Sequence, residues 1–189
     1  MARPTRAELL ASVHNEVKDV AGPGMAVLFC GINPGLHTSL TGHHFAGPGN
    51  RFFPTLHASG FTPRRLRPEE KGELVGLGLG ITNVVTRATA TAAELTREEV
   101  KAGAVALEAK VRRLSPRWLA VLGIGTYRTG FGEPKARVGR QDRRIGETRV
   151  WVLPNPSGLN AHYTPADFAR LFSELREAAG LPDRRGEDV

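Results

Sequence analysis

The sequence predicts an α/β fold, a three-layer sandwich built on a mostly parallel central sheet. Three short apolar runs, at 26–30, 77–85 and 117–123, have the length and the β-branched content of buried strands. Between the second and third runs, residues 96–114 carry apolar side chains at helical spacing. Strands that alternate with helices form parallel sheets covered by helices on both faces, which is the architecture we expect here.

Capping and turn signals predict the elements of the first half of the chain. Thr5-x-x-Glu8 has the form of a capping box that opens an amphipathic helix. The inward face of this helix is expected to hold Leu9, Leu10, Val13 and Val17. Residues 36–62 are polar and rich in glycine and predict one long loop, a feature that is uncommon in a compact domain unless it is functional. Short helices are expected from Pro63 to Val75.

The second half of the chain gives clearer signals. Thr96-x-x-Glu99 predicts a second capping box, and the helix behind it should bury Val100, Ala104, Leu107 and Val111. Residues 137–153 alternate as a hairpin that turns near Gly146-Glu147. Thr164 followed by Pro165 predicts the start of the last helix. Its inward face should hold Phe168, Leu171, Phe172 and Leu175.

We expect one domain over residues 1–180, followed by a charged C-terminal tail, 181–189, that frays. No apolar run approaches the roughly 20 residues that a membrane span needs. The first residues, "MARPTRAELLASV", lack the apolar core of a signal peptide. A single cysteine, Cys30, excludes an internal disulfide framework and is expected to be a buried strand residue. These features favour a cytoplasmic protein without membrane association.

The charge balance points to a polyanionic partner. The formal net charge is +7 and the sequence pI is about 10.3. Most of the 26 basic residues are arginines, whose planar guanidinium suits bidentate contacts to phosphate. A basic protein of this size commonly binds nucleic acid, although composition alone does not establish it.

Several kinds of catalytic site are absent from the sequence. No GxxxxGK[ST] motif is present, which argues against a P-loop nucleotide hydrolase. The glycines of 123–130 fit a tight strand-to-helix turn better than a dinucleotide site. His37, His43 and His44 have no carboxylate or cysteine at ligand spacing, which argues against a zinc site. None of the five lysines lies in the loops described next, which argues against Schiff-base chemistry through them.

Two loops rich in Asn, Pro and Gly follow predicted strands: "GINPG" at 31–35 and "NPSGLN" at 155–160. If both strands are central and parallel, the loops face each other across one cleft. Their amides, hydroxyls and backbone groups can orient a water and stabilise charge, but they cannot strongly activate a nucleophile. Such a site suits a reaction with a good leaving group, for which a glycosidic bond to a pyrimidine is one example.

These two motifs, with "FAGPGNRFF" (45–53) and "GITNVVTRAT" (80–89) between them, resemble the mismatch-specific uracil-DNA glycosylase and thymine-DNA glycosylase family of the uracil-DNA glycosylase superfamily. The most specific segment is "WVLPNPSGL" (151–159). The resemblance implies a uracil-DNA glycosylase-like fold. It also implies a repair enzyme without cofactor or metal that flips uracil, or thymine and modified pyrimidines, out of mismatched double-stranded DNA. Hydrolysis of the N-glycosidic bond would leave an abasic site.

The resemblance also implies roles for individual residues. Asn33 would hold the hydrolytic water, and Asn155 would hydrogen-bond toward the base. The base pocket would be formed by Ile32, Thr38, Phe45 and Asn83. The contact with DNA would be made by Ser157 on a phosphate and by a wedge of Gly158, Leu159 and Asn160 that enters the duplex. Weakly paired mismatches are the easiest to open in this way.

The sequence departs from that family at two places. Asn160-Ala161 stands where close bacterial relatives often carry Ser-Arg after the wedge leucine, and Asn83 stands where a lysine is common. Other arginines could contact DNA instead: Arg51, Arg87 and the hairpin set Arg137, Arg140, Arg143 and Arg144. For the hairpin set, a solvated charged face explains the residues equally well. Glu94 is the nearest carboxylate in the loop after the second strand and could assist Asn33, although a surface position is the simpler reading.

Two alternatives to a mismatch-specific enzyme stay open. One is a uracil-DNA glycosylase of another branch that accepts single strands or any opposite base. The other is a basic DNA-binding module that keeps the cleft without useful activity. In each case the partner is DNA and the protein is expected to be a monomer.

Overall fold

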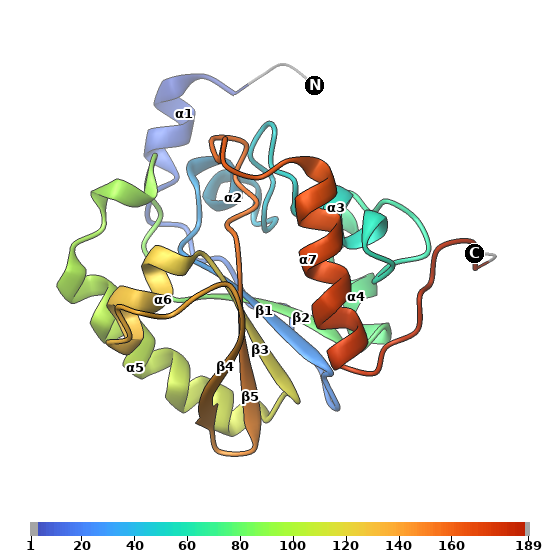
Figure 1. The fold of residues 1–189 in the computed structure, drawn as a ribbon. Coiled ribbons are helices and arrows are strands. Elements are labelled where there is room, and N and C mark those ends of the chain that lie inside the picture. The colour runs from blue at the N-terminus through green and yellow to red at the C-terminus, as the bar shows by residue number, and fades with distance from the viewer. Residues whose placement is uncertain (1–3, 188–189) are drawn as a thin grey trace.

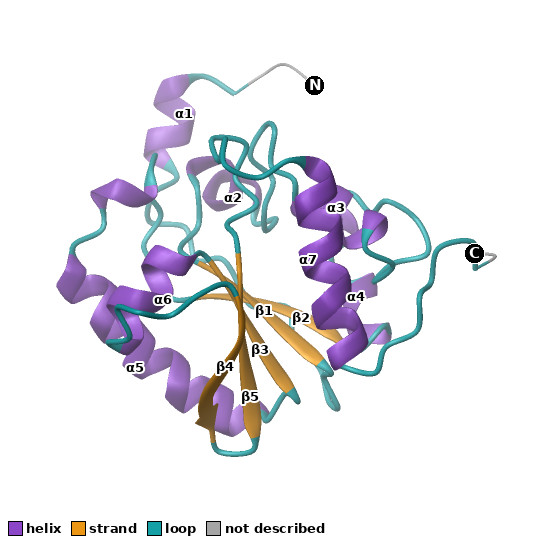
Figure 2. Cartoon of the chain, in the orientation of Figure 1, coloured by secondary structure: helices purple, strands orange, loops and turns teal. Residues whose placement is uncertain are grey.

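A five-stranded sheet runs through the middle of the molecule, with helices on both faces (Figures 1 and 2). The computed structural model describes residues 4–187. The strands are β1 (Val27–Gly31), β2 (Leu79–Asn83), β3 (Trp118–Leu122), β4 (Gly139–Ile145) and β5 (Thr148–Leu153). They lie in the order β2-β1-β3-β5-β4. The first three and β5 are parallel, and β4 pairs with β5 as an antiparallel edge. The predicted three-layer α/β sandwich, with its final hairpin, is confirmed.

The two faces of β1 belong to two separate cores. Phe29 points to the face covered by α3 (Phe52–Ala58) and α7 (Pro165–Ala178), where its ring meets that of Phe52 at 5.3 Å. Cys30 points to the face covered by α5 (Arg97–Leu114) and α6 (Ile124–Phe131). A strand buried on both faces reads as a continuous apolar run, as this one does. Cys30 is fully buried, as predicted, and burial raises the pKa of its thiol.

The capping signals predict the long helices well. Thr96 Oγ1 accepts from the backbone N–H of Glu99 at the start of α5, and Thr164 Oγ1 accepts from Asp167 at the start of α7. The buried faces of both helices hold the residues that their periodicity predicts. Within the described residues, no helix is long and apolar enough to cross a bilayer.

The first helix is shorter than predicted. Its capping box is present, but α1 spans only Arg6–Ala11 and ends at the C-cap Ser12. Val13 and Val17 therefore lie outside the helix, and Leu10 is exposed. The chain that follows runs to Val20, which forms an antiparallel bridge with Ile81 of β2 and extends the sheet locally.

The predicted long loop at 36–62 contains two helices, so that prediction is wrong. Here α2 (Leu36–Thr41) ends at Gly42, whose left-handed backbone lets its N–H donate to Thr38 O at 2.8 Å. The second helix, α3, begins where Asn50 Oδ1 accepts from the backbone N–H of Phe52 at 2.9 Å. Burial of Phe52 and its neighbours against α7 stabilises α3 despite the surrounding glycine and proline. The region 63–75 holds a 3₁₀ turn at Pro68–Glu70 and the start of α4 (Glu73–Gly76).

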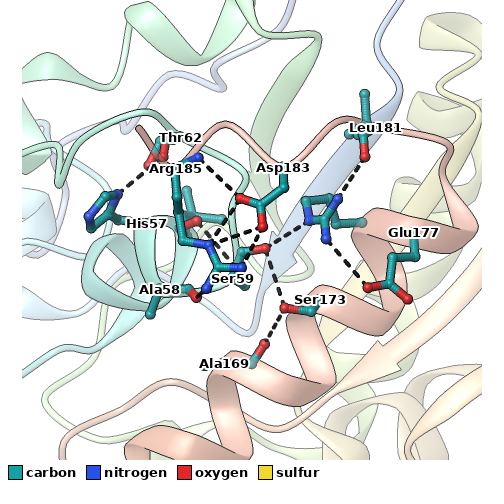
Figure 3. A network of polar contacts seen from close by, with 12 residues as sticks. His57, Ala58, Ser59, Thr62, Ala169, Ser173, Glu177, Leu181, Asp183 and Arg185 are labelled. Carbon is teal, nitrogen blue, oxygen red and sulfur yellow. Dashed lines mark hydrogen bonds and ion pairs between the residues drawn. The ribbon is translucent and has the colours of Figure 1, made fainter. Parts of the chain in front are cut away.

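The C-terminal segment is attached to the body of the protein, which corrects the expectation of a frayed tail for residues 181–187 (Figure 3). Leu181 packs against the core beneath α7. The guanidinium of Arg185 donates to the carbonyl of Ala58 at 3.2 Å and to the carboxylate of Asp183 at 3.0 Å. The charged composition of this segment predicted fraying, and Leu181, the apolar residue that contacts the core, was overlooked. The last two residues of the chain lie outside the described part.

Candidate active site

A cavity of about 490 Å³ lies beyond the carboxyl ends of the parallel strands. Segments from four parts of the chain line it: 31–38 after β1, the loop 44–50, Asn83 with 89–92 after β2, and 155–162 after β5. Because β1 and β5 are parallel and separated only by β3, their following loops meet at the same edge of the sheet. The cleft predicted between the two loops is therefore present.

Two hydrogen bonds fix the side-chain amide of Asn33. Its Nδ2 donates to the carbonyl of Arg87 at 2.9 Å and to the hydroxyl of Thr89 at 2.7 Å. Because the Arg87 carbonyl can only accept, the nitrogen end of the amide must lie on that side. Both amide protons are then used, and the described part of the chain provides no donor to Oδ1. Asn33 therefore offers the cavity a hydrogen-bond acceptor.

Asn155 is held in the opposite sense. Its Oδ1 accepts from the backbone N–H of Ser157 at 3.1 Å, which closes an Asx turn at the start of the second loop. Its carbonyl oxygen accepts from Nδ2 of Asn160 at 3.0 Å. With Oδ1 engaged, the Nδ2 group of Asn155 is the end that remains to donate. The two loops thus bring one fixed acceptor and one fixed donor to a single cavity.

Phe45, Phe52 and Asn83 lie close together on the side of the cavity next to β1. The ring of Phe45 stacks on that of Phe52, with centroids 4.0 Å apart, and the Phe45 backbone has a left-handed φ of 57°. A non-glycine residue in this region carries strain that the surrounding packing must offset. A Cβ on Gly31 would lie 2.6 Å from Asn83 Oδ1 and 3.4 Å from the Phe45 ring. The glycine therefore gives Asn83 and Phe45 their places beside β1.

With this geometry established, the comparison with known families decides the class. The model of the uracil DNA glycosylase superfamily matches residues 19–176. The chain belongs to this superfamily. The match covers the sheet, both Asn-containing loops and nearly all of α7. Membership implies glycosylase activity of the uracil-DNA type, a hydrolysis that serves base excision repair in DNA.

All but two of the site residues predicted from the sequence line the glycosylase cavity. Those that line it are Asn33, Asn155, Ile32, Thr38, Phe45, Asn83, Ser157, Leu159 and Asn160. Gly158 lines an adjoining hollow, and Leu159 lines both this hollow and the cavity. The structure thus brings the predicted positions together around one cavity.

Glu94 does not line the cavity of the glycosylase. Its Oε1 accepts from the backbone N–H of Thr91 at 2.8 Å and so caps the short turn Ala92–Glu94. The cavity lining contains no aspartate or glutamate among the described residues. Glu94 thus lies apart from the residues that line the cavity.

His44 lines the cavity, although from the sequence we considered this residue only as a metal ligand and argued against that role. Its side chain is buried, and Nε2 lies 2.9 Å from the carbonyl of Lys18, to which it must donate. Burial lowers the pKa of His44 below its ordinary value, and the bond to Lys18 opposes this only in part. The ring is therefore neutral at pH 7, with Nδ1 as an acceptor. The adjacent Phe45 motif was the signal that could have identified it.

The loop 155–160 of the glycosylase packs against the segment 45–53, backbone to backbone, where Gly158 meets Gly49. A Cβ on Gly158 would lie 2.7 Å from the carbonyl oxygen of Gly49, so no larger residue fits without movement. The next residue, Leu159, leaves 86% of its surface exposed. Its backbone N–H donates to Ser157 Oγ at 3.2 Å. Leu159 borders both the cavity and the adjoining hollow, where its exposed side chain is accessible to a partner.

Several of the arginines considered as DNA contacts are already engaged within the protein. Arg87 pairs with Glu99 at 2.7 Å. Arg143 pairs with both Glu108 and Glu133. Arg144 lies opposite Arg149 at the amino end of β5, whereas the cavity lies beyond the carboxyl end. The turn of the hairpin therefore lies away from the cavity, and Arg143 and Arg144 belong to a charged face of the edge strand, whereas Arg137 and Arg140 line a separate hollow.

Proposed function

We propose that this protein is a monofunctional mismatch-specific glycosylase that excises uracil from double-stranded DNA after flipping the base out of the helix. The observation that carries the proposal is the opposed orientation of Asn33 and Asn155 in one cavity. A hydrolysis of this kind needs an acceptor for the attacking water and a donor for the departing base, and the two amides supply one each.

In the proposed reaction, Asn33 Oδ1 accepts a hydrogen bond from a water and directs its oxygen to C1′ of the deoxyribose. The C1′–N1 bond breaks, and its electron pair leaves with the pyrimidine as a ring-stabilised anion. The donor group of Asn155 hydrogen-bonds to that anion, and the water proton passes to solvent. Because an amide is a poor base, positioning and charge stabilisation supply most of the rate enhancement.

The flipped pyrimidine is proposed to stack on Phe45. The Phe45 ring is fixed from behind by Phe52, so its free face offers a preformed platform that loses little entropy on binding. Asn83 lies next to this ring across Gly31 and can hydrogen-bond to the edge of the base. The buried Thr38 closes the side expected to hold the deoxyribose.

The proposed preference for mismatches follows from the cost of opening a base pair, which the exposed Leu159 would help to offset. A base in a duplex must be unstacked before it can reach the cavity, and the cost is lowest for weak pairs such as G·U. An apolar side chain on a rigid turn can fill the space that the base leaves. Ser157, at the start of this turn, is proposed to bind a flanking phosphate, since its Oγ accepts from Leu159 N–H and its hydroxyl proton stays available to donate.

The proposal is tested with labelled oligonucleotides that carry G·U, A·U, G·T or a single-stranded uracil. After incubation, alkali cleaves the strand at each abasic site. We expect release to be fastest from G·U, with no strand cleavage before alkali. Equal release from A·U and single strands would instead support a glycosylase of broad specificity. Binding without release from any substrate would support a DNA-binding module and contradict the proposed enzyme.

A further inference from the structure

Arg51 lies outside the cavity lining, yet its side chain holds the loop that carries Leu159. Its Nη1 donates to the carbonyl of Tyr163 at 3.0 Å. Its Nη2 donates to the carbonyls of Ser157 at 2.8 Å and Asn160 at 2.6 Å. One guanidinium therefore joins three carbonyls across the whole length of the loop.

This arrangement replaces the hydrogen bonds that a helix or strand would provide. No helix or strand spans residues 154–164, and the backbone bond within the loop runs from Asn160 N–H to the carbonyl of Ser157 at 3.0 Å. Surface loops of this kind open at low free energy unless their polar groups are tied down. The rigid fork of an arginine can satisfy several carbonyls at fixed relative positions, which the single ammonium of a lysine cannot do.

The base of the Arg51 side chain is itself fixed. Its backbone N–H donates to the carbonyl of Pro156 at 2.8 Å, and its guanidinium carbon lies 4.5 Å from the centre of the Phe168 ring. The backbone of Gly49, two residues earlier, contacts Gly158. Within the described residues, Arg51 has no carboxylate partner, so its charge faces only carbonyl dipoles and an aromatic ring.

We propose that Arg51 is a positioning residue for duplex opening: it fixes the turn at 157–160 so that Leu159 enters the helix as the base leaves. This inference rests on the proposed function and extends it to a residue that touches neither water nor base. Loss of the fork would leave Asn33 held by Arg87 and Thr89, outside this loop, but would make the wedge mobile. The defect should therefore be large where a base pair must be opened and small where the uracil is already unpaired.

Two variants of Arg51 separate the geometry of the guanidinium from its charge, and a third variant serves as a control. Arg51→Met removes both, and Arg51→Lys keeps the charge alone. Arg170→Met is the matched control, because Arg170 is an exposed residue of α7 that pairs only with Glu174 among the described residues. Single-turnover release is measured on a duplex with one G·U pair and on the same duplex with the uracil inside an unpaired bubble. Thermal melting of each variant reports its folding.

We expect both Arg51 variants to lose about 30-fold on the G·U duplex and less than about threefold on the bubble, which is the size of effect that loss of positioning can produce. The control should match the wild type on both. An unchanged ratio of duplex to bubble rates would overturn the inference. Full rescue by lysine, or equal losses on both substrates with a lowered melting temperature, would also overturn it.

A second readout does not depend on turnover. A 2-aminopurine beside the target uracil becomes fluorescent when it is unstacked, so its signal reports entry of the wedge. We expect a rise with wild type and with Arg170→Met, and little rise with the Arg51 variants. An equal rise in all proteins, or none with wild type, contradicts the role. If the wild type gave this rise but released no uracil, the proposed function would fail while the role of Arg51 stood.

Discussion

The side-chain amide of Asn33 donates to the hydroxyl of Thr89 across 2.7 Å, and together with the bond to the carbonyl of Arg87 this contact holds Oδ1 toward the cavity. Asn33 follows β1 and Thr89 follows β2, so two neighbouring parallel strands supply the two partners. The contact is supported by a backbone bond from Thr89 N–H to the carbonyl of Pro34 at 3.2 Å. Asn33, in the turn after β1, thus has its side-chain amide held in a fixed orientation by a residue of the neighbouring loop.

Thr89→Val should therefore slow uracil release while leaving the fold intact. Valine keeps the shape of this buried side chain but removes the acceptor for Asn33 Nδ2. We expect a loss of about fivefold to tenfold in single-turnover rate, the effect of one hydrogen bond of about 1 kcal/mol. DNA affinity, measured by fluorescence anisotropy, should stay unchanged. A rate equal to wild type would show that the Thr89 contact does not orient Asn33.

Leu159→Ala should impair duplex opening without a cost in stability. The leucine is 86% exposed, so its truncation removes almost no packing from the folded protein. We expect the melting temperature to be unchanged and release from a G·U duplex to fall by at least about tenfold, because unstacking costs a few kcal/mol that the wedge helps to offset. Release from single-stranded DNA serves as the internal control. A lowered melting temperature with equal loss on both substrates would contradict a wedge role.

Glu94→Gln tests whether a carboxylate assists Asn33. Glutamine keeps an oxygen that can accept from Thr91, so the turn it caps should persist. Since Glu94 lies outside the cavity lining, we expect the release rate to stay within about twofold of wild type. The release rates of wild type and Glu94→Gln should also depend on pH in the same way. A loss of more than tenfold, with an altered pH profile, would assign Glu94 a direct part in catalysis.

Acid should weaken the pair between Arg87 and Glu99. The hydrogen bond from Arg87 is the largest cause that lowers the pKa of Glu99 from 4.5 to about 2. A carboxyl with a depressed folded-state pKa stabilises the fold above pH 4.5, and this contribution is lost as the pH falls toward 2. Urea midpoints should therefore differ more between wild type and Glu99→Gln at pH 5 than at pH 3. A pH-independent difference would show that the charge of Glu99 does not contribute.

Much of the fold could be predicted from local signals in the sequence. The capping boxes at Thr96 and Thr164 identify α5 and α7, and the double burial of β1 appears as an unbroken apolar run. The two helices within 36–62 could not be predicted, because α2 and α3 are short and depend on tertiary contacts such as those of Phe52. In short segments rich in glycine and proline, packing outweighs local propensity.

The candidate site shows the same division. Motif spacing identified the residues that line the cavity, because the ends of parallel strands meet at one edge of the sheet. The orientation of each amide could not be predicted, since that of Asn33 depends on Arg87 and Thr89 in the loop after β2, and that of Asn155 on the turn it closes with Ser157. The part played by Arg51 was equally hidden. Its sequence suggested a DNA contact, whereas its guanidinium faces three carbonyls of the protein itself.

The central claim is that Asn33 positions the water that releases the base. It is tested most directly by single-turnover release of uracil from a G·U duplex with wild type and Asn33→Ala at equal, saturating protein concentration. The account predicts release by the wild type, a loss of at least about 100-fold in the variant, and equal binding of the duplex by both. Undiminished release by Asn33→Ala would contradict it.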